Sequence, residues 1–250
     1  MIRPKLIRRK PLKHDRLPHD RREMNVTICV AARAGSIIVC ASDRMLSSGD
    51  IQFEPARLSK TSTLTSSIGI MQAGDAAFNS EIMWGVTLEV AEHIKASPSE
   101  WLLVSDIADM YVKYRNTAKT KRAEKSLLSP LGLTLGMFRD NQHQLKDDIA
   151  DQITRDLINY DVPHVSVIIT GIDPNGPHIY VVDDGNISCN DVIGFAAIGI
   201  GARHAETEFM LGKHSWSANS ADAALLTYFA KKKSEISPRS EERRVGKECA

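Results

Sequence analysis

The stretch VTICVAARAGSIIVCASDRMLSSG, residues 26–49, decides the fold. It holds two runs that are rich in apolar and β-branched residues, 26–32 and 36–42, with Ala34 and Gly35 between them. Alternating runs of this kind around a short turn that contains glycine predict a β-hairpin. An acidic residue follows the second run directly, so the hairpin would end in a carboxylate.

More strands and helices are indicated after the hairpin. Residues 67–73 form another strand-like run, which Gly74 closes. Apolar residues at helical spacing then alternate with further strand-like runs. The expected helices lie around residues 78–94, 107–118, 145–157 and 221–229, and the expected later strands around 164–170, 178–182 and 194–201. Grouped strands with helices between the groups predict an α+β layered sandwich rather than alternating βαβ units.

Local signals mark the ends of several of these elements. Ser105 and Ser220 precede helical patterns and are candidate N-caps. The tetrapeptide Asp-Pro-Asn-Gly at 173–176 predicts a turn between two strands. The charged segment TKRAEKSLLSP, residues 120–130, is interpreted as a connection between helices.

Composition divides the chain into a body and two tails. Apolar residues make up 42% of the 250 residues, so a sizeable core is expected in a single domain over 24–238. Residues 1–23 carry nine Lys/Arg against three Asp/Glu and lack apolar periodicity. We expect them to be a disordered basic extension, either a propeptide or a solvated tail. The tail 239–250 is polar and aperiodic, and is expected to be disordered or foreign sequence.

Charge and cysteine content limit the class of protein. The whole chain has a net charge of +1 and residues 1–23 carry +6, so the body is mildly acidic and no nucleic-acid partner is expected. The four cysteines show neither metal-ligand spacing nor a secreted disulfide pattern, which favours a reducing, cytoplasmic compartment. The longest near-apolar run, 192–202, is too short for a membrane helix, so no membrane partner is expected.

Several common chemistries leave no trace in the sequence. It contains no HExxH zinc motif, no GxSxG nucleophile elbow and no GxxxxGK[ST] phosphate loop. The sequence therefore predicts neither a metal nor another cofactor.

Three motifs together resemble the signatures of proteasome β-subunits, which are N-terminal nucleophile (Ntn) hydrolases. The segment SIIVCASDRMLSSG is similar to the family's strand that ends in Asp, here Asp43, with a glycine six residues later. Lys60 precedes the Gly74-Asp75 pair by 14 residues, as the family lysine does. The later segments GPHIYVVDDGN and FAAIGIG resemble the family's second hairpin and its AIGSG turn. The resemblance covers about residues 26–110 and 164–230, with 116–163 as a helical insertion, and it implies a four-layer αββα sandwich.

The resemblance also implies a mechanism for cutting amide bonds. In such enzymes an N-terminal threonine hydroxyl attacks a peptide carbonyl, with its own α-amino group as the base. A nearby ammonium lowers the pKa of that amine, and an aspartate holds the ammonium. A backbone N–H at the glycine turn stabilises the oxyanion, an effect worth about 3 kcal/mol.

Carried over by position, Thr27 matches the nucleophile, Asp43 the aspartate, Lys60 the lysine and Gly74 the oxyanion glycine. Gln72 would lie at the floor of the pocket for a substrate side chain and would tolerate polar side chains there. Taken singly, each residue has an ordinary structural interpretation, such as a turn aspartate or a surface lysine.

Three functions remain open. The first is a threonine-type endopeptidase, active once residues 1–26 are removed. The second is a non-catalytic ring subunit, because Val26 stands where self-processing members have glycine and Ile200 where they have serine. A gapped alignment would also place Asn25 or Val26 at the nucleophile position. The third is an Ntn amidohydrolase that acts on a small amide.

The partners expected here follow from the resemblance alone. Proteasome-like subunits close into stacked homo-oligomeric rings whose active sites face an inner chamber. Their substrates are peptides or unfolded proteins, and an ATP-driven unfoldase feeds some members of the family.

Overall fold

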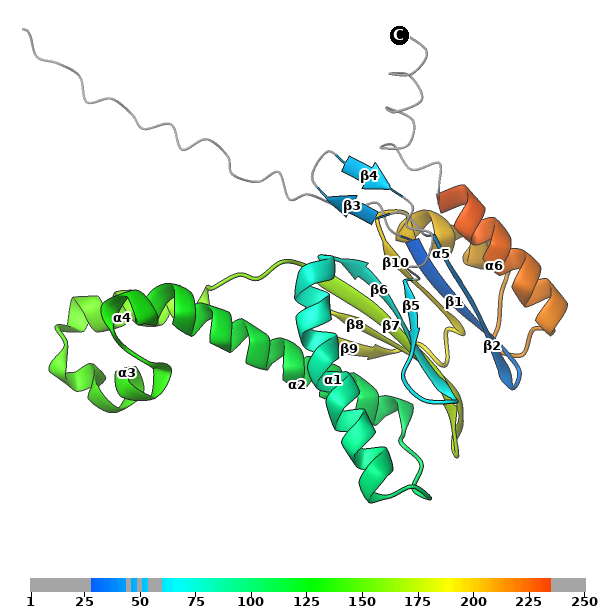
Figure 1. Ribbon diagram of the computed structural model, residues 1–250. Coiled ribbons are helices and arrows are strands. Elements are labelled where there is room, and N and C mark those ends of the chain that lie inside the picture. The colour runs from blue at the N-terminus through cyan, green and yellow to red at the C-terminus, as the bar shows by residue number, and fades with distance from the viewer. Residues whose placement is uncertain (1–27, 44–45, 49–50, 54–59, 235–250) are drawn as a thin grey trace, which may run out of the picture.

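The computed structural model describes residues 28–43, 46–48, 51–53 and 60–234, and these form a mixed α and β structure with two larger antiparallel sheets (Figure 1). The expectations for residues 1–23, for Thr27 and for the tail 239–250 lie outside the described residues.

Within the described residues the strands pair into three sheets, all of them antiparallel. One sheet has the order β10–β1–β2, with β1 at Ile28–Ala34, β2 at Ile37–Ser42 and β10 at Phe195–Gly199. The five-stranded sheet has the order β5–β6–β7–β8–β9, at Thr61–Thr63, Ile68–Gly74, Val165–Asp173, Gly176–Asp183 and Asn186–Cys189. The short strands β3, Leu46–Ser48, and β4, Ile51–Phe53, pair with each other.

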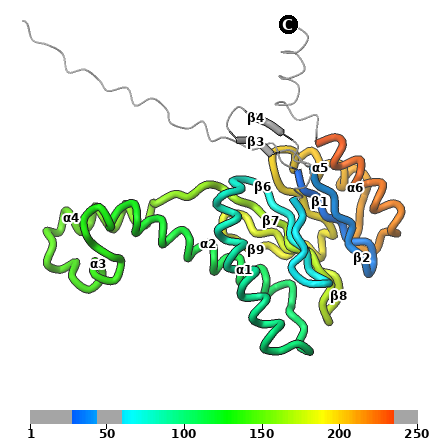
Figure 2. Tube along the Cα trace, viewed as in Figure 1, coloured from blue at the N-terminus to red at the C-terminus, as the bar shows by residue number. Residues whose placement is uncertain are grey.

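Helices cover these sheets and also extend beyond them. Four helices pack on the sheets: α1 at Ala76–Ala96, α2 at Val104–Ala123, α5 at Ala202–Leu211 and α6 at Ser220–Ser234. The chain after α2 forms a π-helical turn η1 at Glu124–Leu128, η2 at Ser129–Leu131, α3 at Leu135–Asn141, η3 at Gln142–Gln144 and α4 at Asp147–Ile158. Figure 2 shows this helical arm projecting away from both sheets at the end of α2.

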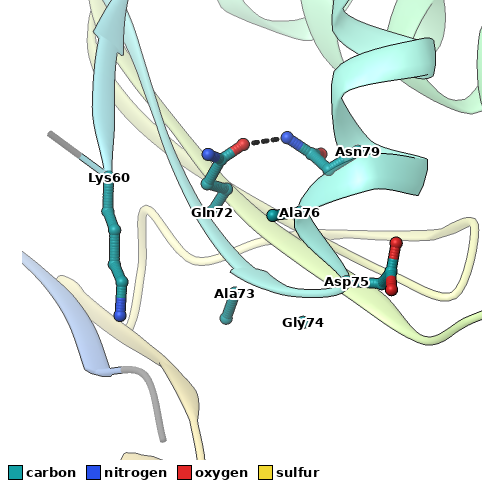
Figure 3. A pocket seen from close by; sticks show the side chains of 7 residues that line it. All are labelled: Lys60, Gln72, Ala73, Gly74, Asp75, Ala76 and Asn79. Atoms are coloured by element: carbon teal, nitrogen blue, oxygen red, sulfur yellow. Dashed lines mark hydrogen bonds between the residues drawn. The ribbon is translucent and has the colours of Figure 1, made fainter. Parts of the chain in front are cut away.

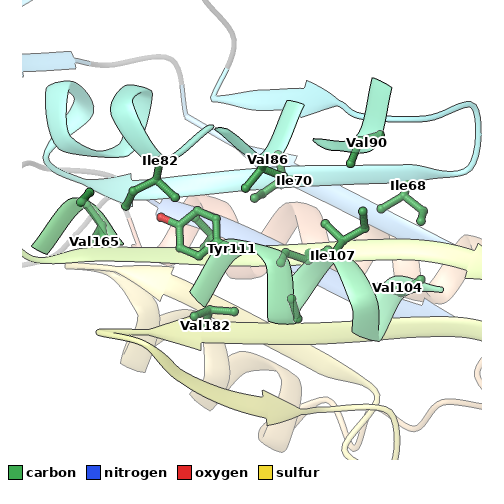
Figure 4. Packing of buried hydrophobic residues seen from close by; sticks show 14 of the residues in the cluster. Ile68, Ile70, Ile82, Val86, Val90, Val104, Ile107, Tyr111, Val165 and Val182 are labelled. Carbon is green, nitrogen blue, oxygen red and sulfur yellow. The ribbon is translucent and has the colours of Figure 1, made fainter. Parts of the chain in front are cut away.

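Three apolar clusters hold the body together. The largest joins α1 and α2 to one face of the five-stranded sheet, and Tyr111, Ile82 and Ile107 are fully buried in it (Figure 4). The second joins the other face of that sheet to β1 and β10, through residues such as Met71 and Ile198. The third joins the outer face of β1 and β10 to α5 and α6. Strands β1, β6 and β7, which lie between these clusters, are therefore largely buried.

The structure confirms most of the expected elements. The hairpin of β1 and β2 forms, and the chain turns at Gly35, whose φ of +59° suits glycine. The four expected helices appear as α1, α2, α4 and α6, and the three later strands as β7, β8 and β10.

Both predicted N-caps are wrong. Ser105 lies inside α2, whose first residue, Val104, donates its backbone N–H to Oδ2 of Asp173 at 3.1 Å. Asp173 belongs to β7, so a residue 69 positions away caps this helix. Ser220 is already the first residue of α6, and the side chain of Asn219 accepts the backbone N–H of Asp222 at 2.9 Å instead.

The prediction of a connection over residues 120–130 is also wrong. Helix α2 continues to Ala123, and helical turns follow it without a break to Leu131. The charged side chains that suggested a loop are compatible with a helix because Lys121 and Lys125 are exposed, whereas the apolar Ala123 and Leu128 are buried.

Candidate functional site

Asp43 is fixed at the end of the hairpin by Ile28. Its backbone N–H donates to the carbonyl oxygen of Ile28 at 3.1 Å. The carboxylate oxygen Oδ1 of Asp43 accepts a hydrogen bond from the backbone N–H of Ile28 at 3.0 Å. The register of β1 and β2, which pairs Cys29 with Ser42, brings these two positions together. The carboxylate of Asp43 is therefore held against the first residue of β1.

Lys60 completes a buried ion pair with Asp43. It lies directly before β5, and the backbone N–H of Gln72 donates to its carbonyl oxygen at 3.2 Å. Its Nζ is 2.7 Å from Oδ1 of Asp43, and the exposed fractions of the two side chains are 5% and 14%. A lysine is almost never buried to this extent without a partner, which argues against a solvated surface charge. The structure thus brings together the two charged residues that the sequence singled out.

Gly74 forms a turn that only glycine can occupy. It ends β6 with a φ of +100°, a region that other residues rarely enter. A Cβ atom at this position would lie 2.3 Å from the backbone oxygen of His164. The same oxygen accepts the backbone N–H of Asp75 at 3.0 Å, and Asp75 then caps α1 through the N–H of Phe78. The turn therefore joins the end of a strand directly to the start of a helix.

A small pocket lies where these elements meet (Figure 3). It is lined by Lys60, Gln72, Ala73, Gly74, Asp75, Ala76 and Asn79. Three of the sequence-predicted site residues, Lys60, Gln72 and Gly74, thus share one pocket, and Asp43 adjoins it through its ion pair with Lys60. Thr27, the expected nucleophile, lies outside the described residues, but its carbonyl carbon is bonded to the Ile28 nitrogen that Asp43 holds.

Two residues of this region were not predicted from the sequence. Asn79 lines the pocket and is only 2% exposed, and its side-chain amide donates to Oε1 of Gln72. The hydroxyl of Tyr111, on α2, donates to Oδ1 of Asn79 at 2.6 Å. One signal was available, because Asn79 has helical spacing to Ile82 and Val86 and so is a polar residue on the apolar face of α1.

Cys29 lies beside the ion pair, but its thiol is a poor nucleophile. Its Sγ donates to the carbonyl oxygen of Gln72 at 3.4 Å. Burial raises the pKa of the Cys29 thiol to about 12, against a smaller opposing effect from the Lys60 ammonium. The nucleophilic form of a cysteine is its thiolate, which this site disfavours. Cys29 is therefore an apolar neighbour of the site rather than a second nucleophile.

We expect Cys29 to resist thiol reagents that modify the exposed Cys189. At pH 8 in the folded protein, peptide mapping after brief alkylation should find label on Cys189 and none on Cys29, because the Cys29 thiol is buried and protonated. In urea both should react. The raised pKa also means that the unfolded chain loses this proton first, so the contribution of this thiol to stability is present below about pH 9 and is lost toward pH 12. Equal labelling of both cysteines in the folded protein would contradict this account.

Metal binding and membrane spanning find no support in the described part of the chain. Over residues 28–43 and 60–234, His, Cys, Asp and Glu side chains nowhere gather in a group of three or more that could hold a metal ion. Within the same residues, none of the helices has both the length and the apolar character needed to cross a bilayer.

No protein-family model matches this chain, and no curated protein matches it either. A function therefore has to be inferred from the geometry of the pocket and of the ion pair beside it.

Proposed function

We propose that this chain is a threonine-type peptidase subunit whose nucleophile is the hydroxyl of Thr27 once residues 1–26 are removed. One observation carries the proposal: a single carboxylate oxygen of Asp43 accepts both the ammonium of Lys60, at 2.7 Å, and the backbone N–H of Ile28, at 3.0 Å. The lysine charge is thereby held next to the peptide nitrogen that joins Thr27 to the described chain.

This arrangement supplies what an N-terminal nucleophile requires. After processing, Thr27 would carry a free α-amino group, whose ordinary pKa is about 8. A nearby ammonium lowers the pKa of such an amine, so that more of it is the free base at neutral pH. The amine would take the proton of the Thr27 hydroxyl as the oxygen attacks the substrate carbonyl. The peptide C–N bond would then break, and the leaving amine would take the proton from the Thr27 α-ammonium while the acyl group stays on the threonine oxygen as an ester. Water would hydrolyse this ester, which releases the acyl product as a carboxylic acid and regenerates the hydroxyl.

The turn at Gly74 fits the remaining role. In the proposed mechanism its backbone N–H stabilises the oxyanion of the tetrahedral intermediate, an effect typically worth about 3 kcal/mol. Gly74 and Lys60 line the same pocket, so a carbonyl bound there would lie close to both. The close approach of the Gly74 backbone to His164 limits movement of this turn, and such a preorganised donor is what oxyanion stabilisation requires.

The proposal extends to the fold and the assembly. We infer a four-layer αββα sandwich of the Ntn hydrolase type, supported by the three apolar clusters, which place helices outside two facing sheets. A homo-oligomeric ring, an unfoldase that feeds it and a cytoplasmic location belong to the same proposal. The three described cysteines, all of which are free thiols, agree with a reducing compartment.

The experiment that tests the proposal is to determine the mature N-terminus and to label it. Intact mass and N-terminal sequencing of the purified protein should show a chain that begins at Thr27. An electrophilic inhibitor directed at N-terminal threonines should attach once per mature chain, and the Thr27→Ala variant should stay unlabelled. Peptide hydrolysis by a chain that retains its residues before Thr27 would rule out this mechanism.

A second candidate, a non-catalytic subunit of the same fold, is favoured by one observation. Ile200 occupies the turn between β10 and α5, where the resemblance implies a serine that would bond to the catalytic amine. An isoleucine side chain can neither donate nor accept such a hydrogen bond. For this candidate we expect a folded, oligomeric protein that neither takes the label nor cleaves peptides.

A further inference from the structure

The last helix of the helical arm has little packing of its own. None of the 12 residues of α4 is buried, and its main contacts are with η1 and η3, which belong to the arm itself. A helix of this length is marginal in water and depends on packing against other elements. The arm projects away from both sheets (Figure 2), so the body of the same chain does not supply that packing. We therefore expect another surface to cover α4 in the assembled protein.

The two faces of α4 differ in character. Leu157 lines a groove together with residues of α2, which shows which face of α4 points toward the rest of the arm. Helical spacing places a second, mainly acidic set on the opposite face. Its members are all exposed, and they are Asp147, Asp148, Asp151, Arg155 and Ile158. The side chain of Ile158 stands out, because it is large and apolar and yet 72% exposed.

A surface that complements this face lies at the end of α2. Lys121 and Lys125 are exposed and one helical turn apart, and they form a basic strip. The same part of α2 borders the groove, which has a volume of about 250 Å³ and whose lining includes Ala123, Leu135 and Leu157. A space of about 150 Å³ already admits a benzene ring, so the groove has room for a branched aliphatic side chain.

The acidic face and the basic strip do not pair within one chain. Among the described residues, none of the ion pairs joins an aspartate of α4 to Lys121 or Lys125. Arg122, between these two lysines, is engaged with Glu81 of α1 at 2.8 Å. Two surfaces of opposite charge on one arm are what a two-fold contact between identical chains requires, because each surface then meets its complement on the other chain.

We propose that two copies of this chain associate through their helical arms across a two-fold axis. The acidic face of α4 in each copy lies on the basic strip of the other, and Ile158 of each copy enters the groove of the other. The charges set the register of the contact, and the buried apolar area supplies affinity. The contact does not depend on the proposed peptidase reaction. It adds to the proposed homo-oligomer an interface within the insertion, outside the part of the chain that carries the resemblance.

Two charge-reversal variants test whether the contact lies between chains. Lys121→Glu/Lys125→Glu makes both surfaces of the arm acidic, and Asp148→Lys/Asp151→Lys makes both of them basic. In analytical ultracentrifugation of the full chain, each variant alone should have half the mass of the wild-type assembly, because like charges then meet at both halves of the contact. An equimolar mixture should regain the wild-type mass, since every acidic surface again meets a basic one.

The mixture also separates the proposal from a folding defect. Mixing cannot repair a misfolded chain, nor an ion pair that is needed inside one arm. Native mass spectrometry of the restored assembly should therefore show equal numbers of the two variants. The proposal is overturned if the mixture stays at half the wild-type mass, or if either variant alone keeps the full mass.

Ile158→Ser tests the apolar part of the contact. The dissociation constant for self-association should rise at least about tenfold, because a large aliphatic side chain is no longer buried. Val192→Ser is the matched control, since Val192 is also exposed but lies outside the arm, after β9. Equal effects of the two changes would contradict the placement of Ile158 in the groove. A wild-type protein that sediments as a single chain would overturn the arm contact and leave the peptidase reaction to its own test, the labelling of Thr27.

Discussion

Lys60→Met should lower the rate of peptide hydrolysis by roughly a thousandfold, within the range expected for loss of a group that assists proton transfer. The same change should reduce the free energy of unfolding by about 3–5 kcal/mol, because it leaves the buried carboxylate of Asp43 without its cation. Hydrolysis would be followed with an unstructured protein substrate, and stability by urea unfolding. An active Lys60→Met enzyme would contradict the proposed mechanism.

The chain offers a matched control for this variant in Lys113. Its Nζ is also 2.7 Å from a carboxylate oxygen, that of Glu89, but its side chain is 60% exposed. Exposed ion pairs are typically worth less than about 1 kcal/mol. Lys113→Met should therefore unfold nearly as wild type does and keep full activity, and equal losses in both variants would show that burial is not what matters.

A double variant separates stability from chemistry. In Asp43→Asn/Lys60→Met the buried carboxylate is gone together with its cation, and the amide oxygen of the substituted side chain can still accept the backbone N–H of Ile28. Removing both charges of a buried pair is often far less damaging than removing one. We expect this variant to be more stable than Lys60→Met and still inactive. Recovery of activity along with stability would mean that the pair is structural only.

Gly74→Ala is the second change with a large expected effect, here on stability. Its φ of +100° is strained for alanine, and its Cβ would overlap the backbone oxygen of His164 at 2.3 Å. Because that oxygen belongs to the backbone beside β7, it cannot move without disturbing the pairing of Gly74 with Val165. Together these effects should cost about 2–4 kcal/mol of unfolding free energy, measured by urea unfolding.

Gly35→Ala is the control for this second prediction. Gly35 also has a positive φ, +59°, but a Cβ there would meet nothing within 4 Å. Its substitution should cost only about 1 kcal/mol, the strain of the left-handed conformation alone. The difference between the two alanine variants then measures the overlap with His164, and equal losses would show that the turn at Gly74 relaxes freely.

The features that sequence predicted well are those set by local pattern. The hairpin of β1 and β2 follows from two alternating runs around Gly35, and α1 from apolar residues at helical spacing. The pairing of Asp43 with Lys60 was expected from the resemblance, and the two side chains do meet. Asp43 directly follows β2 and Lys60 directly precedes β5, so strand pairing fixes the backbone position of both residues.

The features that sequence missed depend on contacts between distant segments. Ser105 looked like a cap, but Asp173 from another element reaches the start of α2 first. The sequence near Asn79 and Tyr111 does not predict the hydrogen bond between their side chains. Helical spacing indicates which face of α1 or α2 is buried, but it does not identify the element that packs against that face. Hydrogen bonds of this kind depend on how distant elements pack against each other, which the local sequence pattern does not show.

The contacts of Asp43 with Lys60 and Ile28 have a consequence for how such a subunit would be activated. Both contacts of Asp43, with Lys60 and with Ile28, are present in a chain that still has 26 residues before Thr27. The desolvation free energy of the two buried charges is therefore already compensated when the precursor folds. Activation would then require one covalent cut and no refolding of the described residues. Under the proposed peptidase function, such a precursor would be a latent enzyme that a single peptide bond keeps inactive.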